Sequence, residues 1–421
     1  MTPMERVILA GRRDPYVNDQ RFLSTMEELE NLTQTAGGDV VAAVTQTRPT
    51  VDPATYIGSG KVQEIERLCR EFEADAVIFN DELSPSQQTN LATRLDVKVL
   101  DRTQLILDIF AGRAHSREGR LQVELAQLNY LLPRLTGLGL SLSRLGGGIG
   151  TRGPGETQLE TDRRHIRRRI GDIKKQLETV VRHREQYRQR RRRNGQFQVA
   201  IVGYTNAGKS TLFNRLTTAE TLEENKLFAT LDPLTRRFRT PRGFQLLMSD
   251  TVGFIQKLPT TLVAAFRSTL EETREADLIL HVIDISDPDH ESRMETVDKL
   301  LKELGAGEVP RLILYNKIDR RSERLEPLLP LDGLLISAFD PLDIQKVSKA
   351  IESCIIKQSL PYTVMVSPSD GRLLSRLTAE TLVMDKGWDE SKQAYYCHGF
   401  VWSGSALRDR LTTQETEEDD V

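Results

Sequence analysis

Short apolar runs alternate with helical patterns over the first 110 or so residues of the chain. The apolar runs are rich in β-branched residues and read RVILAG, DVVAAVTQ, DAVIFN and VKVLD. Between them stand helical patterns such as KVQEIERLCREFEA and SPSQQTNLATRL. Strands that alternate with helices are typical of a parallel sheet. The pattern therefore predicts an α/β domain over residues 1–112.

One turn in this region imitates a phosphate-binding loop. Residues 58–61 read GSGK and stand directly before a helical pattern. A working phosphate loop needs a longer spacing, and a hydroxyl residue after its lysine to bind magnesium. Because Val62 follows Lys61, we predict a tight glycine turn before a helix here, not a nucleotide site.

A second pattern begins after Glu118, where apolar residues recur in steps of four and three on two separate segments. The first stripe is Leu121, Leu125, Leu128, Leu132 and Leu135, and the second is Ile166, Ile170, Ile173, Leu177 and Val180. This spacing predicts two helices joined as an antiparallel hairpin over 113–195. The second helix, from about Glu156 to Arg193, would extend on the order of 55 Å and project.

The segment between the stripes, 136–155, is rich in glycine and reads TGLGLSLSRLGGGIGTRGPG. We predict a loop at the tip of the hairpin. An inert linker is the alternative, but its several leucines are unusual for one. Loops at the end of rigid elements commonly carry recognition, which favours a functional tip.

The net charge of the whole chain is only −3, but the predicted hairpin carries a large excess of positive charge. Residues 111–195 hold 20 Lys and Arg against 8 Asp and Glu, a net charge of +12. Dense arginines beside a glycine-rich tip favour contact with nucleic-acid phosphates over a merely solvated face. Few aromatics accompany them, so we expect recognition of a folded RNA by its shape. The candidate RNA-binding residues are Arg144, Arg152, Arg163, Arg164, Arg167 and Arg168.

The strongest chemical signal follows the apolar run FQVAIV at 197–202. The next residues, GYTNAGKS, have the spacing of a phosphate loop, and TLFNRLT continues as a helix. In such a loop, backbone amides surround the β-phosphate, the lysine bridges phosphate oxygens and the hydroxyl residue binds Mg²⁺. The predicted nucleotide-binding residues are Gly203, Tyr204, Thr205, Asn206, Ala207, Gly208, Lys209, Ser210 and Thr211.

Asn206 leaves two interpretations open. The loop resembles that of potassium-activated GTPases, in which an asparagine at this position is a ligand of the cation, so K⁺ is a possible cofactor. Alternatively, the side chain only pins the loop through hydrogen bonds to the backbone.

Two later motifs complete a GTP site. Asp250 ends the apolar run LLMSD, where its carboxylate can reach the magnesium ion, and Gly253 lets the backbone approach the γ-phosphate. The run RLILYNKID then brings three residues to the base. Asp319 can accept two hydrogen bonds that guanine offers and adenine does not, so we predict GTP as the substrate. The other base-binding residues are Asn316, Lys317, Ser337 and Ala338.

Composition indicates the cellular compartment in which this activity would take place. The chain has 421 residues and only three widely spaced cysteines, which suits reduced thiols and offers no zinc cluster. It starts without a cationic, apolar leader and has no apolar stretch near the 18 or so residues of a membrane span. We expect a cytoplasmic protein and a monomer.

Several strings outside the general GTPase motifs resemble the HflX family. They are GPGETQLETDRRHIRRRI, LQVELAQLNYLLPRL, LFATLDPLTRR and DTVGFI. The resemblance covers about residues 1–360 and implies binding to the large ribosomal subunit and its rRNA, with a role in splitting or rescuing stalled ribosomes. It also implies that Thr230 closes over magnesium and the γ-phosphate, although Thr235 is near enough to compete. Leu234 departs from the threonine expected there.

The resulting prediction is a multidomain α/β GTPase with Lys209, Thr230, Asp250 and Gly253 as its catalytic residues. Its GTPase domain would span 196–358, and a small α+β domain with an acidic tail would span 359–421. Two alternatives stay open: a tRNA-modification GTPase, although no second cofactor cluster is evident, and a non-catalytic RNA-binding or ribosome-assembly protein. The intact nucleotide motifs argue against the second alternative.

Overall fold

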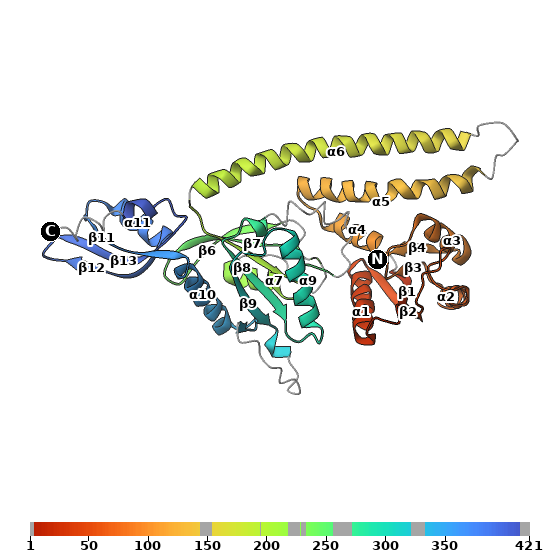
Figure 1. The fold of residues 1–421 in the computed structure, drawn as a ribbon, viewed down its shortest axis with the longest axis horizontal. Helices are drawn as coiled ribbons and strands as arrows, with labels where there is room; N and C mark the ends of the chain where they lie inside the picture. Colours follow the sequence, from red (N-terminus) through yellow and green to blue (C-terminus); the bar gives the residue numbers. More distant parts are fainter. Residues whose placement is uncertain are drawn as a thin grey trace. The chain divides into compact units, whose positions relative to one another are not determined.

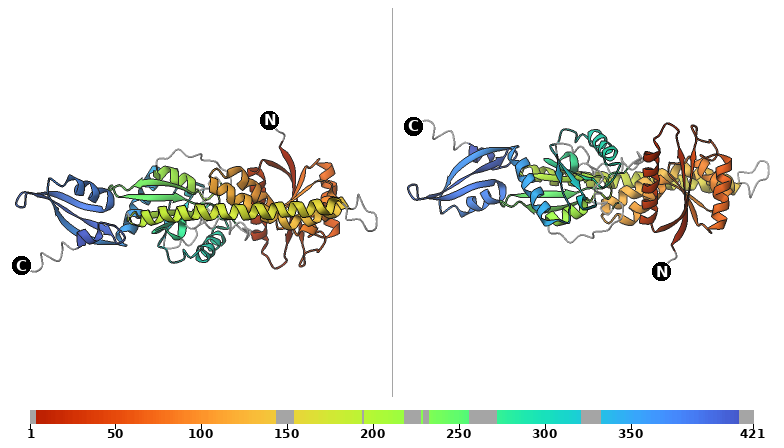
Figure 2. Two further views of the ribbon diagram at one scale, coloured as in Figure 1. Left: turned by 90° about the horizontal axis from the view of Figure 1, so that it is seen from above. Right: turned by 90° about the horizontal axis from the view of Figure 1, so that it is seen from below.

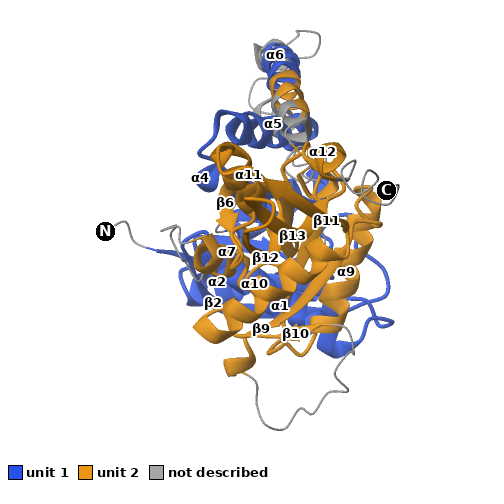
Figure 3. Ribbon diagram, turned by 90° about the vertical axis from the view of Figure 1, so that its left-hand side faces the viewer, with its two compact units in different colours: residues 1–180, 226–231, 256–266 blue, residues 181–225, 232–255, 267–421 orange. Residues whose placement is uncertain are grey.

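The computed structural model describes residues 4–143, 154–193, 195–217, 228, 233–255, 272–320 and 333–412. The chain divides into two compact units, which Figure 3 shows in different colours. Unit 1 comprises 1–180, 226–231 and 256–266, and unit 2 comprises 181–225, 232–255 and 267–421.

Unit 1 contains the predicted parallel sheet. The sheet has four strands in the order β2-β1-β3-β4, and each neighbouring pair runs parallel. All four strands coincide with the apolar runs that predicted them. Their bounds are β1 Glu5–Arg13, β2 Gly38–Thr47, β3 Ala76–Phe79 and β4 Lys98–Asp101.

Helices cover both faces of this sheet (Figure 2). On one face, α2 and α3 contribute Val62, Ile65 and Leu91 to the buried apolar cluster. On the other face, the guanidinium of Arg102 in α4 pairs with Glu28 of α1. The GSGK turn opens α2 as predicted, with Gly58 as its N-cap residue. The helices are α1 Asp19–Thr35, α2 Ser59–Glu71, α3 Pro85–Leu95 and α4 Arg102–Arg113.

The hairpin is formed by α5, Arg117–Ser143, and α6, Pro154–Arg193 (Figure 1). Arg169 of α6 donates two hydrogen bonds to the Glu124 carboxylate of α5, at 2.6 and 2.8 Å. The predicted tip loop 136–155 was too long, because α5 continues to Ser143 and α6 already begins at Pro154. The leucine spacing continues past Leu135, and isolated glycines lower helix stability by only about 1 kcal/mol each.

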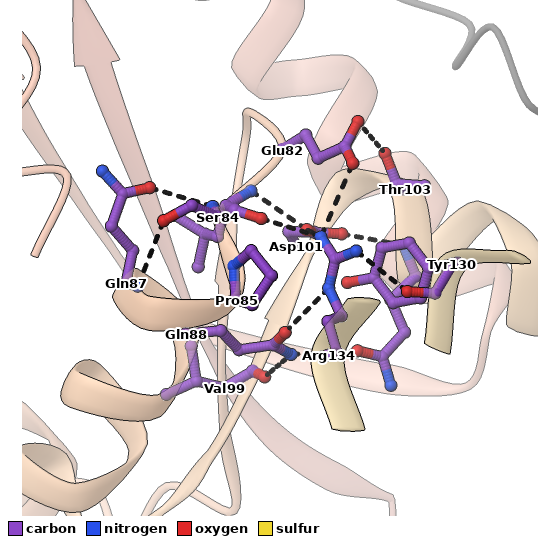
Figure 4. A network of polar contacts seen from close by, with 12 residues as sticks. Glu82, Ser84, Pro85, Gln87, Gln88, Val99, Asp101, Thr103, Tyr130 and Arg134 are labelled. Carbon is purple, nitrogen blue, oxygen red and sulfur yellow. Dashed lines mark hydrogen bonds and ion pairs between the residues drawn. The ribbon is translucent and has the colours of Figure 1, made fainter. Parts of the chain in front are cut away.

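A buried polar network ties α5 to the α/β domain (Figure 4). Arg134 donates from Nη2 to the Leu83 carbonyl at 2.7 Å and to Asp101 Oδ2 at 3.2 Å. Its guanidinium also lies over the Tyr130 ring, 3.5 Å from the centroid. Asp101 is fully buried and accepts the backbone amides of Leu83 and Gln104 as well. Asp101 therefore has charged and neutral partners inside the protein, while 11% of the Arg134 side chain stays exposed.

Unit 2 is built on a six-stranded sheet in the order β10-β9-β8-β5-β7-β6. All neighbours run parallel except β6, which is antiparallel to β7. β5 lies between β7 and β8, so the chain leaves its carboxyl end at a switch in strand order, where open α/β sheets bind ligands. The strands are β5 Gln198–Gly203, β6 Leu234–Arg239, β7 Gln245–Asp250, β8 Leu278–Asp284, β9 Arg311–Asn316 and β10 Leu334–Leu335.

Two apolar clusters hold helices against this sheet. One cluster joins Ile201 and Leu280 of the strands to Leu212 of α7 and Val347 of α10. The other cluster lies on the opposite face and packs Val297 of α9 against the strands. The helices are α7 Lys209–Thr217, α9 His290–Glu303, the 3₁₀ turn η1 Ile318–Arg320 and α10 Pro341–Ile356.

The last described segment forms a three-stranded antiparallel sheet in the order β11-β13-β12. Trp402 of β13 packs edge to face on Phe197 beside β5, with 5.3 Å between ring centroids. This contact joins the small sheet to the main core of unit 2. The acidic tail lies outside the described residues. The elements are β11 Ser359–Val366, α11 Gly371–Glu380, β12 Leu382–Asp389, β13 Ala394–Trp402 and α12 Arg408–Thr412.

Candidate nucleotide-binding site

The loop from Gly203 to Gly208 connects β5 to α7 at the carboxyl edge of the sheet. Gly208 has a φ of 94°, a conformation that L side chains rarely adopt. A Cβ atom there would also collide with Nδ2 of the Asn316 side chain. The glycine is therefore required both by the backbone and by the close approach of the residue predicted to bind the base.

Lys209 opens α7 and is only 7% exposed. Its ammonium donates to the Tyr204 carbonyl at 2.7 Å, within the loop itself. Burial lowers the pKa of Lys209 to about 8, an effect that the negative charge of Asp250 opposes. A bound phosphate group would supply negative charge beside this buried ammonium.

Ser210 and Asp250 converge beside that lysine. The Ser210 hydroxyl donates to Asp250 Oδ2 at 2.7 Å, which joins the start of α7 to the end of β7. A hydroxyl and a carboxylate are hard oxygen ligands of the kind that Mg²⁺ uses together with substrate phosphates. The two side chains therefore fit a magnesium ion. Within the described parts of the chain, no group of three or more His, Cys, Asp or Glu side chains could hold a metal ion by itself.

The residues after Asp250 lie directly against the phosphate loop. A Cβ atom at Gly253 would be 2.8 Å from Thr205 Cγ2 and 3.0 Å from Lys209 Nζ. Phe254 forms a parallel bridge with Tyr204: its amide donates to the Gly203 carbonyl at 3.1 Å, and its carbonyl accepts the Thr205 amide at 2.8 Å. This coupling between two nucleotide motifs was not predicted from the sequence.

The base-binding motif lies at the end of β9. Asn316 donates from Nδ2 to the Ala207 carbonyl at 2.8 Å and accepts the Ala338 amide at 2.9 Å. The Ser337 hydroxyl donates to Asp319 Oδ1 at 2.6 Å. Asp319 itself is exposed, so its carboxylate is oriented and open to a ligand. The structure thus brings together the phosphate loop and both segments that were predicted to bind guanine.

Two supporting carboxylates escaped the sequence analysis. Asp343, in the first turn of α10, accepts the Ser337 amide at 2.8 Å. Asp284, the last residue of β8, accepts the Lys317 ammonium at 2.7 Å. The only available signal was the position of each residue, at a helix start or a strand end, which many acidic residues share.

The remaining predicted residues fall into three groups. Thr211 lies on α7, partly buried. Thr230 lies outside the described residues. Thr235, the alternative candidate for closing over the γ-phosphate, is on β6 and shares a hydrogen bond of 2.8 Å with Ser249. Of the candidate RNA-binding arginines, Arg144 and Arg152 also lie outside the described residues. The other four, Arg163, Arg164, Arg167 and Arg168, lie on α6, where all but the partly buried Arg163 are exposed.

Comparison with known proteins agrees with this geometry. Three family models match, described as GTP-binding GTPase N-terminal over residues 24–111, GTP-binding GTPase Middle Region over 113–191 and 50S ribosome-binding GTPase over 198–317. The GTPase HflX of Alkalihalophilus pseudofirmus is 54% identical over 410 residues, which cover 97% of this chain and 96% of that protein. The chain belongs to the HflX family of GTPases.

Other relatives extend the comparison. The GTPase HflX of Escherichia coli is 43% identical over 381 residues, which cover 89% of each chain. Among solved structures, the one described as the crystal structure of SsGBP and GDP complex is 25% identical, covers 83% of this chain and 98% of that chain, and has a TM-score of 0.49.

Family membership decides the activity. The protein is a GTPase that binds guanine nucleotides and hydrolyses GTP. The prediction of a multidomain α/β fold with a phosphate loop is confirmed, and so is the resemblance to HflX. No helix in the described part of the chain is both long and apolar enough to cross a membrane.

Proposed function

We propose that this HflX-type GTPase binds the large ribosomal subunit through its basic hairpin while GTP is bound, and acts in the splitting or rescue of ribosomes. The observation that supports this proposal is the cluster of exposed arginines on α6, Arg164, Arg167 and Arg168, within a segment of net charge +12. Such a surface favours RNA phosphates. The family description, 50S ribosome-binding GTPase, points to the same partner.

We further propose that hydrolysis uses Mg²⁺ held by Ser210 and Asp250, with Thr230 closing over the site. When bound, the ion would stabilise the negative charge that develops on the phosphate oxygens. Lys209 would exchange the Tyr204 carbonyl, now 2.7 Å away, for phosphate oxygens. Because the lysine is already buried, its charge would act on those oxygens with little screening by water.

Sedimentation with purified ribosomal particles tests the proposed partner. With a non-hydrolysable GTP analogue, the protein should migrate with the large subunit and convert whole ribosomes into subunits. With GDP, most of it should stay at the top of the gradient. Lys209→Ala, which removes the phosphate ligand, should stay there with either nucleotide. Equal binding with both nucleotides, or migration with the small subunit instead, would contradict the proposal.

A further inference from the structure

Asp284 places a nearly buried carboxylate next to the base-binding motif. It is the last residue of β8 and is paired in register with Asn316 of β9. Its Oδ2 lies 2.7 Å from the Lys317 ammonium, and the side chains of Asp284 and Lys317 are only 18% and 12% exposed. Water screens such a partly buried ion pair less than it screens an exposed one. Lys317 is therefore held at one end by a partner that has no predicted contact with the nucleotide.

The carboxylate of Asp284 is itself fixed in orientation. Its Oδ1 accepts the Ser286 amide at 3.1 Å and the Ser286 hydroxyl at 2.6 Å. The next amide, that of Ile285, donates to the Asn316 carbonyl at 3.0 Å and extends the pairing of β8 with β9 into the site. The oxygen that faces Lys317 therefore cannot rotate away without breaking these bonds.

The backbone of Lys317 limits the lysine from its other end. Its φ is 66°, a left-handed conformation that is uncommon for a residue with a side chain. This conformation fixes the direction in which the side chain leaves the backbone. With the ammonium bound to Asp284, both ends of the aliphatic stem are defined. An unrestrained lysine side chain would lose rotamer entropy on being ordered by a ligand.

We infer that Asp284 is a positioning residue for guanine-nucleotide binding: it holds the aliphatic stem of Lys317 in place to cover the face of the bound base. The inference rests on the assignment of Asn316, Lys317 and Asp319 as the base-binding residues. Contact with the face of a base does not depend on its exocyclic groups. Asp284 therefore contributes to affinity for any purine of similar shape, whereas Asp319 distinguishes guanine from other bases.

A double-mutant cycle on the full-length protein tests this inference. GDP and IDP affinities are measured by titration for Asp284→Asn, Lys317→Ala and the double variant. Each single variant should bind GDP about tenfold more weakly, the scale of one lost bond to a charged group. The double variant should bind no more weakly than Lys317→Ala, because the aspartate acts through the lysine. The ratio of GDP to IDP affinity should not change in Asp284→Asn.

Two further variants keep the outcome interpretable. Ser286→Ala removes the 2.6 Å bond to the carboxylate and should give a smaller loss, which disappears in the Lys317→Ala background. Asp298→Asn is a matched control, because that carboxylate pairs with Arg311, 2.5 Å away, and not with Lys317. Its GDP affinity should equal that of the parent. Additive losses in the cycle, or parental affinity in Asp284→Asn, would overturn the role of Asp284. Parental affinity in Lys317→Ala would overturn the assigned base site itself.

Discussion

Phe254 occupies a position where many GTPases place a glutamine that orients the attacking water. Its side chain is 3% exposed and packs with Tyr204 in an apolar cluster, while its backbone is bonded to the phosphate loop. A buried apolar ring cannot hold a water molecule by hydrogen bonding. At the scale of single residues, the site therefore contains groups that fit a phosphate and a magnesium ion, but the residue at this position cannot position water.

Asn206 offers one way to complete the chemistry. It is exposed, has a φ of 61°, and within the described residues its side chain makes no hydrogen bond that would pin the loop. An amide oxygen there can hold a potassium ion against the phosphates and offset charge in the transition state. We predict that GTP turnover measured with ribosomes is faster in potassium than in sodium, and that Asn206→Ala removes the difference. Equal parental rates in the two salts would exclude the cation.

Asp319 gives a second prediction at this scale. Its carboxylate is oriented by the Ser337 hydroxyl at 2.6 Å and is otherwise open. In Asp319→Asn, an amide would face the donors of guanine, so GTP affinity should fall by on the order of 3 kcal/mol. Xanthine nucleotides should then be preferred, since they present an acceptor in place of the 2-amino group. Competition titration of GTP against XTP measures this change. A variant that still prefers guanine would disprove the base-reading role.

At the scale of elements, the arginines of α6 lead to a prediction about RNA binding. Replacing Arg163, Arg164, Arg167 and Arg168 with Gln should weaken ribosome binding and flatten its dependence on salt. The slope of log K against log salt should drop by about 0.7 to 0.9 for each phosphate contact that is lost. Binding measured from low to high potassium chloride gives this slope. GTP affinity should not change, because the arginines lie on another element.

A matched variant separates contact from general charge. Lys174 and Lys175 are also exposed on α6 but lie further from its start at Pro154. Their replacement by Gln should change the slope less, per charge removed, than replacement of the arginines. If the slope of the arginine variant matches that of the parent, the arginines form only a solvated face.

The attachment of α5 to the α/β domain gives a prediction of stability. Arg134→Met would leave the fully buried Asp101 without its arginine. Removing one partner of a buried ion pair typically destabilises by about 3 to 5 kcal/mol. Because Asp101 keeps two amide donors, we expect the lower end of this range. Hydrogen exchange of the α5 amides under increasing denaturant measures the loss.

Arg169→Gln is the control for that experiment. It removes the exposed bidentate ion pair between Arg169 of α6 and Glu124 of α5. Hydrogen exchange of α5 should stay nearly unchanged, because water screens such pairs and replaces their hydrogen bonds. Equal protection of α5 in Arg134→Met and in the parent protein would show that the network of Figure 4 contributes little to stability.

At the scale of the whole molecule, nucleotide chemistry and partner binding should depend on each other. With Phe254 buried, intrinsic hydrolysis should be slow, and a bound ribosome should accelerate it by positioning the attacking water. Phosphate release measured with and without large subunits tests this prediction. Fast turnover by the protein alone would contradict it, as would a rate that ribosomes leave unchanged.

The sequence determined the elements and motifs that depend on local order. The four parallel strands of unit 1, the two hairpin helices and the strand-loop-helix around Lys209 all follow from apolar period, turn residues and motif spacing. These features are readable because each is specified within a few consecutive residues. The prediction failed where that local signal was mixed, as at residues 136–143, where leucine spacing favours a helix and glycine opposes it.

The tertiary structure brings together the distant residues that support the nucleotide site, and also those that attach α5 to the α/β domain. Three contacts join residues that are 33 or more positions apart: the bridge from Phe254 to the phosphate loop, the ion pair of Asp284 with Lys317, and that of Asp101 with Arg134. Nothing in local composition distinguishes these residues from other phenylalanines, aspartates and arginines. Strand order and register bring such side chains together, because parallel strands place the ends of separate segments at one edge of the sheet.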